Sequence, residues 1–80
     1  MKLPRDLSGR DLAAALARLG YQLDRQTGSH IRLTTQRCGE HHVTIPAHDP
    51  LKIGTLNAVL KAVGAHLRLD RDQLLHELWE

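Results

Sequence analysis

Two runs of alternating apolar and polar residues, residues 30–36 and 40–45, constrain the fold more than any other feature of the sequence. Such alternation is typical of strands that bury one face and expose the other. The short loop between the runs ends in Gly39, the glycine that a three-residue hairpin loop with a bulge requires. In the register that this loop sets, apolar residues pair on one face, Leu33 with Val43 and Ile31 with Ile45. The sequence therefore predicts an antiparallel hairpin with one buried face.

The opposite face of this hairpin is polar and predicts a surface that can contact a ligand. Its residues are His30, Arg32, Thr34, His42 and Thr44. His30 opens the first strand directly after Gly28 and Ser29, where glycine allows a tight turn. Because an imidazole on a solvated surface titrates near neutral pH, His30 can carry a proton to or from a ligand. The residues alone also allow an ordinary surface turn at this position.

A helix and a strand are predicted ahead of the hairpin. Ser8 and Asp11 form a capping-box pattern at the start of a helix over about residues 9–19. Tyr21 and Leu23 then alternate with polar residues, which predicts a half-buried strand.

Two more helices are predicted after the hairpin. Thr55 is a good N-cap for a helix over residues 56–63, with Gly64 as its stop. Another capping-box pattern precedes a helix over about residues 71–79. The order is α-β-β-β-α with a short C-terminal helix. This order predicts an α+β fold in which helices cover one face of a three-stranded antiparallel sheet.

Length and composition fit one small globular domain over residues 1–80. The chain is 41% hydrophobic and 25% charged, and no apolar run approaches the roughly 18 residues of a membrane span. Because the first residues also lack the apolar region of a signal peptide, we expect the protein in the cytoplasm. Residues 1–37 carry seven Lys and Arg against three Asp and Glu, a balance that suits a polyanion such as RNA. The scarcity of aromatic residues predicts contacts with phosphates rather than stacking on bases.

Several short motifs follow one another along about residues 7–76: Leu19-Gly20-Tyr21, Gly28-Ser29-His30, Val43-Thr44-Ile45-Pro46-Ala47-His48, Gly54-Thr55-Leu56 and Val63-Gly64. In this order and spacing they resemble the HicA toxins of bacterial and archaeal toxin–antitoxin pairs. The resemblance implies a double-stranded-RNA-binding-domain-like fold, in agreement with the order of elements above. It also implies an mRNA interferase, an endoribonuclease that a HicB-type antitoxin neutralises.

The resemblance further implies that His30 is the catalytic residue. RNA supplies its own nucleophile, the 2′-hydroxyl, so cleavage needs a base, an acid and cations for the phosphate. A histidine can serve as either proton carrier, at roughly 10²–10⁴-fold each, and no metal ion or other cofactor is expected. Two residues remain open as the second proton carrier, His42 and His48. The residues expected to contact RNA are Ser29, Arg32, His48, Lys52 and Thr55, the last two at a helix N-terminus where anions are stabilised.

The residues leave other interpretations open. Cys38, His41, His42 and His48 invite a zinc site, but neighbouring strand residues point to opposite faces, which argues against a shared ion. A noncatalytic RNA-binding module of the same fold, or a structural protein that binds a partner through its C-terminal helix, would use the same elements. Trp79 in that helix is interpreted as core cover or, alternatively, as part of an antitoxin surface. We expect any oligomer to form through the antitoxin.

Overall fold

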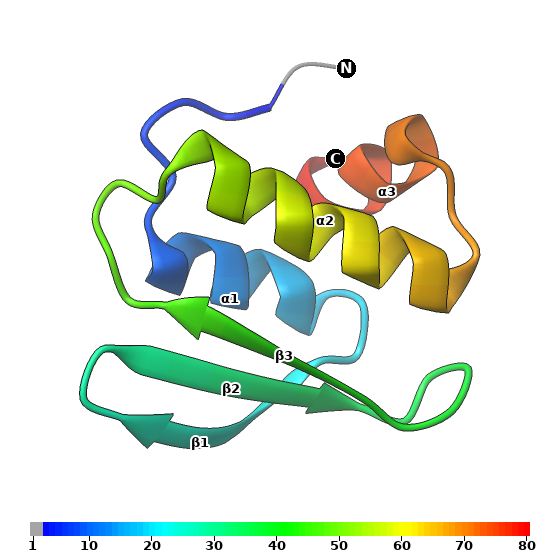
Figure 1. The fold of residues 1–80 in the computed structure, drawn as a ribbon. Helices are drawn as coiled ribbons and strands as arrows, with labels where there is room; N and C mark the ends of the chain where they lie inside the picture. Colours follow the sequence, from blue (N-terminus) through cyan, green and yellow to red (C-terminus); the bar gives the residue numbers. More distant parts are fainter. Residues whose placement is uncertain (1–2) are drawn as a thin grey trace.

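The computed structural model describes residues 3–80 and confirms an α+β fold (Figure 1). Its elements are α1 (Gly9–Ala17), β1 (Gln22–Thr27), β2 (His30–Thr35), β3 (His41–Pro46), α2 (Ile53–Leu67) and α3 (Arg71–Trp79). The strands form one antiparallel sheet in the order β1-β2-β3, and the helices lie together on one of its faces. This arrangement confirms the double-stranded-RNA-binding-domain-like fold, with α3 as the additional C-terminal helix.

The hairpin register predicted from the sequence is confirmed. The buried pairs are Ile31 with Ile45 and Leu33 with Val43. Each turn of the sheet contains a glycine with positive φ, Gly28 at 54° between β1 and β2 and Gly39 at 99° between β2 and β3. Most other residues would be strained in this conformation. The helices cover the opposite, apolar face (Figure 1), so the polar face of the β2–β3 hairpin remains free of helices, as expected.

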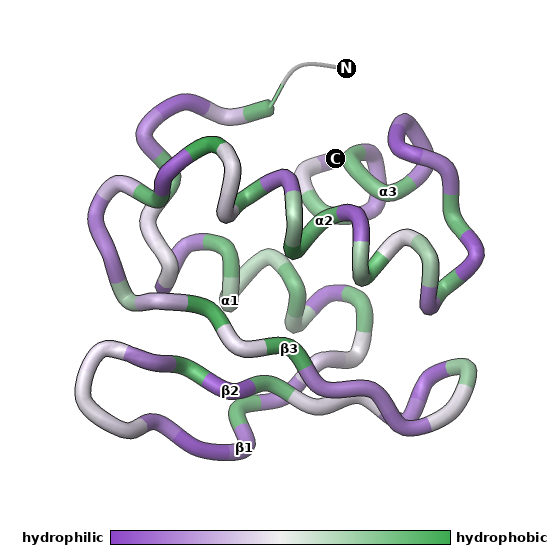
Figure 2. The backbone as a smooth tube through the Cα atoms, in the orientation of Figure 1, coloured by the Kyte–Doolittle hydropathy of each residue, from purple (hydrophilic) through white to green (hydrophobic). Residues whose placement is uncertain are grey.

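The core lies between the sheet and the helices. All three helices contribute fully buried side chains, including Leu12, Leu60 and Leu78. In Figure 2, hydrophobic and hydrophilic residues alternate along each helix, whereas β1 is hydrophilic over most of its length. Trp79 is half-buried against this core, as expected for core cover. None of the helices within residues 3–80 has the length and apolar character needed to cross a membrane.

The helix α2 is longer than the sequence pattern predicts. It begins at Ile53 with Lys52 as its N-cap, so Thr55 lies in the first turn and is not the cap. It also continues past Gly64, which was expected to end it. The absence of a side chain at Gly64 instead allows the chain before α3 to pack closely on the helix. A Cβ atom at Gly64 would lie 3.1 Å from the carbonyl oxygen of Leu69, so the connection to α3 passes directly over the helix at this point.

The other two helices follow their predicted caps. Capping boxes are present at Ser8 with Asp11 and at Asp70 with Gln73. The helix α3 spans the predicted residues, whereas α1 ends at Ala17, earlier than expected. Sequence signals for helix starts were therefore more reliable in these two helices than the signal for a helix end.

The edge strand β1 differs from the predicted half-buried strand. Leu23 pairs with Leu33 and so faces the helices, yet its side chain is 60% exposed. The ladder is irregular between Leu23 and Arg25, as at a β-bulge, and every residue of β1 is exposed. The expectation that Leu23 is half-buried was wrong, because the α1 residues on this side are mainly alanines, which are too short to cover it.

Candidate functional site

Three chain segments that are distant in the sequence meet at one end of the sheet. Figure 1 shows them at the left: the turn from β1 to β2, the start of the connection from β3 to α2, and the first residues of α1. The Ala47 N–H donates to the Ser29 carbonyl oxygen, with 2.6 Å between nitrogen and oxygen. The Gly9 N–H donates in the same way to the His48 carbonyl oxygen, at 2.9 Å. We call this end the His30 corner and define it by Gly9, Gly28-Ser29-His30 and Pro46-Ala47-His48.

Glycine at the start of α1 makes this meeting possible. A Cβ atom at Gly9 would collide with the carbonyl oxygen of Pro46 and would lie 3.1 Å from the Ala47 Cα atom. The helix therefore approaches the end of β3 with its backbone, and the Ser8 hydroxyl accepts a hydrogen bond from the Asp11 N–H in its first turn. Backbone contacts rather than long side chains thus hold the His30 corner together.

His30 lies in this corner with its side chain exposed to solvent. It opens β2, where it pairs with Thr27 of β1 and Pro46 of β3. Among residues 3–80, no side chain forms a hydrogen bond or an ion pair with the His30 imidazole. The ring is therefore accessible to a ligand, on the side of the sheet that the helices do not cover.

The rest of the polar face carries a chain of polar contacts in which cations have acidic partners. Arg32 Nε lies 3.4 Å from Asp24 Oδ2, and the Thr34 hydroxyl donates to the same carboxylate at 3.2 Å. His42 Nδ1 lies 2.6 Å from the Thr34 hydroxyl oxygen, and His42 Nε2 lies 3.1 Å from Glu40 Oε2. The hydrogen bond with His42 is the main cause that lowers the pKa of the Glu40 carboxyl group. Away from His30 this face is therefore nearly balanced in charge rather than uniformly basic.

The residues expected to contact RNA fall into two groups. Ser29 and His48 are exposed and belong to the His30 corner, and Arg32 lies further along β2. Lys52 and Thr55 lie at the start of α2, as its N-cap and in its first turn. No side chain caps the N–H groups of this first turn. Its peptide groups can therefore bind an anion.

The four residues considered for a zinc site do not come together in the structure. Cys38 is exposed in the loop between β2 and β3, while His41 and His42 make contacts on opposite sides of β3, with Tyr21 and Thr34 respectively. Within residues 3–80, no group of three or more His, Cys, Asp and Glu side chains is arranged to hold a metal ion.

A family model described as the HicA toxin of bacterial toxin–antitoxin systems matches residues 9–65, well over half of the chain. The chain belongs to the HicA toxin family. The resemblance stated from the sequence motifs is thus confirmed, and the protein is a toxin of a toxin–antitoxin system. The matched segment of this HicA toxin contains the whole His30 corner and ends before α3. No curated protein and no solved structure matches the chain.

A second cluster of titratable side chains lies at the other end of β3 in this HicA toxin. Tyr21 OH lies 2.8 Å from His41 Nδ1, and the His41 ring stacks on the His66 ring with 4.3 Å between centroids. His66 Nε2 donates to the carbonyl oxygens of Arg37 and Gly39, at 2.9 and 3.0 Å. Burial raises the pKa of Tyr21 to about 12, and it is also the largest cause that lowers the pKa of His41. No local sequence pattern indicates this cluster, because its members are far apart in the chain.

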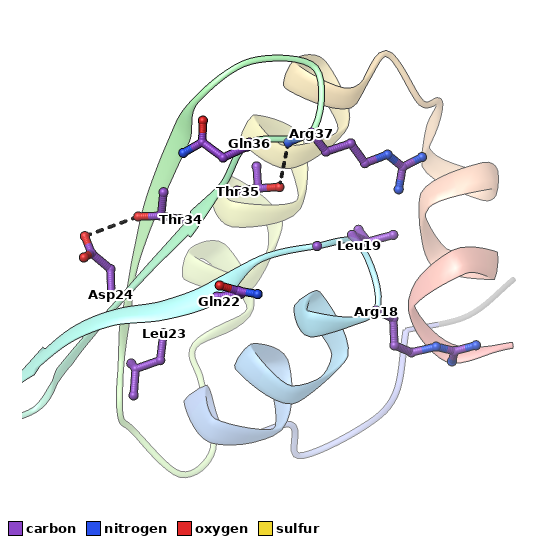
Figure 3. A pocket seen from close by; sticks show the side chains of 10 residues that line it. Arg18, Leu19, Gln22, Leu23, Asp24, Thr34, Thr35, Gln36 and Arg37 are labelled. Carbon is purple, nitrogen blue, oxygen red and sulfur yellow. Dashed lines mark hydrogen bonds between the residues drawn. The ribbon is translucent and has the colours of Figure 1, made fainter.

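A hollow of the HicA toxin also lies away from the His30 corner. It has a volume of about 560 Å³ and lies between the turn after α1 and the end of β2 (Figure 3). The guanidinium groups of Arg18 and Arg37 extend from it toward α3, where they contact the Leu78 carbonyl at 3.0 Å and the Glu77 carboxylate at 3.6 Å. These arginines connect the hollow to α3.

Proposed function

We propose that this HicA toxin is an endoribonuclease that cleaves mRNA in the cytoplasm and that a HicB-type antitoxin neutralises. The observation that carries this proposal is the exposed His30 imidazole at a corner where three chain segments meet. Its ring has no protein partner among residues 3–80, so a substrate can reach it. Membership in a toxin family supports a damaging activity of this kind.

The chemistry at His30 requires only proton transfers. The 2′-hydroxyl of RNA attacks the adjacent phosphorus atom, and His30 accepts the proton of that hydroxyl. The bond from phosphorus to the 5′-oxygen breaks, and a second group gives this oxygen a proton. The products are a 2′,3′-cyclic phosphate and a free 5′-hydroxyl. Each proton carrier contributes roughly 10²–10⁴-fold to the rate. In the reverse assignment, the second group is the base and His30 is the acid that protonates the 5′-oxygen.

His48 is the better of the two candidates for the second proton carrier. Ala47, which precedes His48, donates a backbone hydrogen bond to Ser29, which precedes His30. His42 instead pairs with Thr34, which follows His30 by four residues of extended strand, or about 13 Å. Its imidazole also contacts Thr34 and Glu40. These contacts support a structural role for His42 on the polar face.

The phosphate contacts of this proposal surround the His30 corner. Ser29 supplies a hydroxyl beside His30, and Lys52 supplies an exposed cation at the start of α2. The uncapped first turn of α2, including Thr55, adds N–H groups that stabilise an anion. Arg32 contributes only when a phosphate displaces its ion pair with Asp24.

The experiment that tests the proposal compares purified wild-type toxin with the variants His30→Ala and His42→Ala on single-stranded mRNA fragments. We expect His30→Ala to lower the rate of cleavage by about 10²–10⁴-fold. Its melting temperature should stay unchanged, because substitutions at exposed positions usually change stability by no more than about 0.5 kcal/mol. His42→Ala is the matched control, since it removes an imidazole from the same face and should retain most of the activity.

Three results would contradict the proposal. A folded His30→Ala variant that cleaves at the wild-type rate would remove His30 from the reaction. Loss of cleavage in His42→Ala instead would move the chemistry along the sheet. RNA binding by the wild type without any cleavage would favour the alternative function, a noncatalytic RNA-binding module.

A further inference from the structure

A groove with a volume of about 450 Å³ lies between α1 and β1, on the side of the sheet that faces the helices. We call it the α1–β1 groove. Its walls and rim include Arg10, Ala13, Ala14 and Ala17 of α1 and Leu23 and Gln26 of β1. Buried Ile31 and Leu33 of the next strand also line it.

The groove is open because α1 presents mainly alanine side chains to β1, together with Arg10. Leu23 faces this side through its pairing with Leu33, but it is 60% exposed, since alanine methyl groups do not reach far enough to cover it. Figure 3 shows the Leu23 side chain pointing away from Asp24, which lies near Thr34. A large apolar side chain beside a row of alanines is an apolar patch of the kind that marks an interaction site.

The charge around the groove indicates which partner it suits. Of residues 3–80, Arg10 is the only charged one that lines it. In the part of the chain that the structure describes, no carboxylate forms an ion pair with Arg10. The chain as a whole is basic, with a net charge of +2 and a sequence pI of about 9.1. A complementary occupant therefore combines large apolar side chains with a carboxylate.

We propose that the α1–β1 groove is the docking site for an acidic segment of the antitoxin. The segment inserts a large apolar side chain between Leu23 and Ala14 and places a carboxylate against Arg10. This inference rests on the antitoxin partner named in the proposed function, but it does not depend on RNA cleavage.

The position of the groove explains how an antitoxin bound there would reach the active site. Gln26 at its rim pairs with Ile31, the residue after His30. Arg10 follows Gly9, whose N–H donates to the His48 carbonyl in the His30 corner. The His30 imidazole lies on the opposite face of the sheet, so a protein anchored in the groove blocks the approach of RNA by extending past the edge strand β1, without a bond to the imidazole.

The experiment measures binding of purified toxin to the purified product of the reading frame beside the toxin gene, by titration calorimetry. We expect Ala14→Glu to lower the affinity at least about tenfold, because the new side chain fills the groove. Its carboxylate also lies one helical turn after Arg10 and pairs with it. Leu23→Ser removes the opposite wall and should weaken binding in the same way. The matched control Ala62→Glu makes the same change on an exposed part of α2 and should bind like the wild type.

Each variant is also tested without the partner, for melting temperature and for RNA cleavage. Both should match the wild type, because Ala14 and Leu23 are exposed and lie outside the His30 corner. Wild-type affinity in Ala14→Glu and Leu23→Ser, or a wild-type toxin that binds no product of the adjacent frame, would overturn the inference. So would a wild-type dimer that Ala14→Glu converts to a monomer, since the occupant would then be a second copy. Absence of RNA cleavage with these binding results intact would contradict the proposed function alone.

Discussion

At the scale of single residues, Asp24 limits the positive charge that Arg32 offers to RNA. The two side chains are 3.4 Å apart and each is less than half exposed. A phosphate that approaches Arg32 must compete with this carboxylate. On the proposed function, we therefore expect the affinity of the polar face for RNA to depend on one acidic residue of the edge strand.

We expect Asp24→Asn to increase the affinity for a short single-stranded RNA about threefold to tenfold at low salt, with a smaller gain at high salt. Stability should change little, because surface ion pairs contribute about 0–1 kcal/mol. The measurement is an RNA titration at several salt concentrations. Glu80→Gln, which removes the same charge at the chain end, is the control. Weaker binding by Asp24→Asn would show that Asp24 orients Arg32 for RNA rather than competing with it.

Residue positions could be predicted from the sequence wherever a local period decides them. The alternation in residues 30–36 placed His30 and Leu33 on opposite faces, because side chains alternate strictly along a strand. The same alternation failed for Leu23. Its exposure depends on the small size of the α1 residues above it, and no local pattern in β1 contains that information.

At the scale of elements, the position of α1 depends on the close approach of Gly9 to the end of β3. We expect Gly9→Ala to destabilise the fold by about 1–3 kcal/mol, because a methyl group at this position overlaps the Pro46 carbonyl. Cleavage should fall as well, even at temperatures where the variant is folded, since the overlap separates α1 from the His30 corner. Chemical denaturation and RNA cleavage at low temperature measure the two effects.

The control for this prediction is Gly54→Ala in the first turn of α2, where a Cβ atom meets nothing within 4 Å. That variant should be as stable as the wild type or more stable, since alanine favours a helix. Equal stability of Gly9→Ala and wild type would contradict the prediction, because the end of β3 would then shift at little cost in free energy to make room for the methyl group.

Element boundaries were harder to predict where a glycine is involved. Gly64 was expected to end α2, but it lies inside the helix and allows the close approach of the Leu69 carbonyl, which would lie 3.1 Å from a Cβ atom at this position. Sequence spacing does not distinguish a glycine that ends a helix from one that permits close packing. The capping boxes of α1 and α3 were predictable, because both partners of each box are local.

At the scale of the whole molecule, the Tyr21–His41–His66 cluster links the start of β1 and β3 to the last turns of α2. The pKa of His41 is below the ordinary value of 6.5, first because of burial and then because of His66 and His42. The unfolded chain therefore binds a proton at this residue at higher pH than the folded chain does. The stability that His41 contributes is present above pH 6.5 and is lost as the pH falls through the lower folded value.

We therefore expect the free energy of unfolding to decrease when the pH is lowered from about 7 toward 5. His41→Gln should reduce this dependence, because it removes the titrating group and can still accept a hydrogen bond from Tyr21. His76→Gln, which removes an exposed histidine of α3, is the control and should keep the wild-type dependence. Urea denaturation at a series of pH values measures the effect. An unchanged pH dependence in His41→Gln would assign the titration to another group.

The backbone hydrogen bonds of the His30 corner also bear on how such a toxin can change over evolutionary time. They join Ser29 to Ala47 and Gly9 to His48 through peptide groups, which every residue except proline supplies in full. The side chains of Ser29 and Ala47 can thus be exchanged while the imidazole of His30 keeps its place, whereas Gly9 and Gly28 must stay glycine. If the proposed RNA cleavage takes place here, new sequence preferences can arise from single substitutions at these two positions, without any rebuilding of the framework that holds His30.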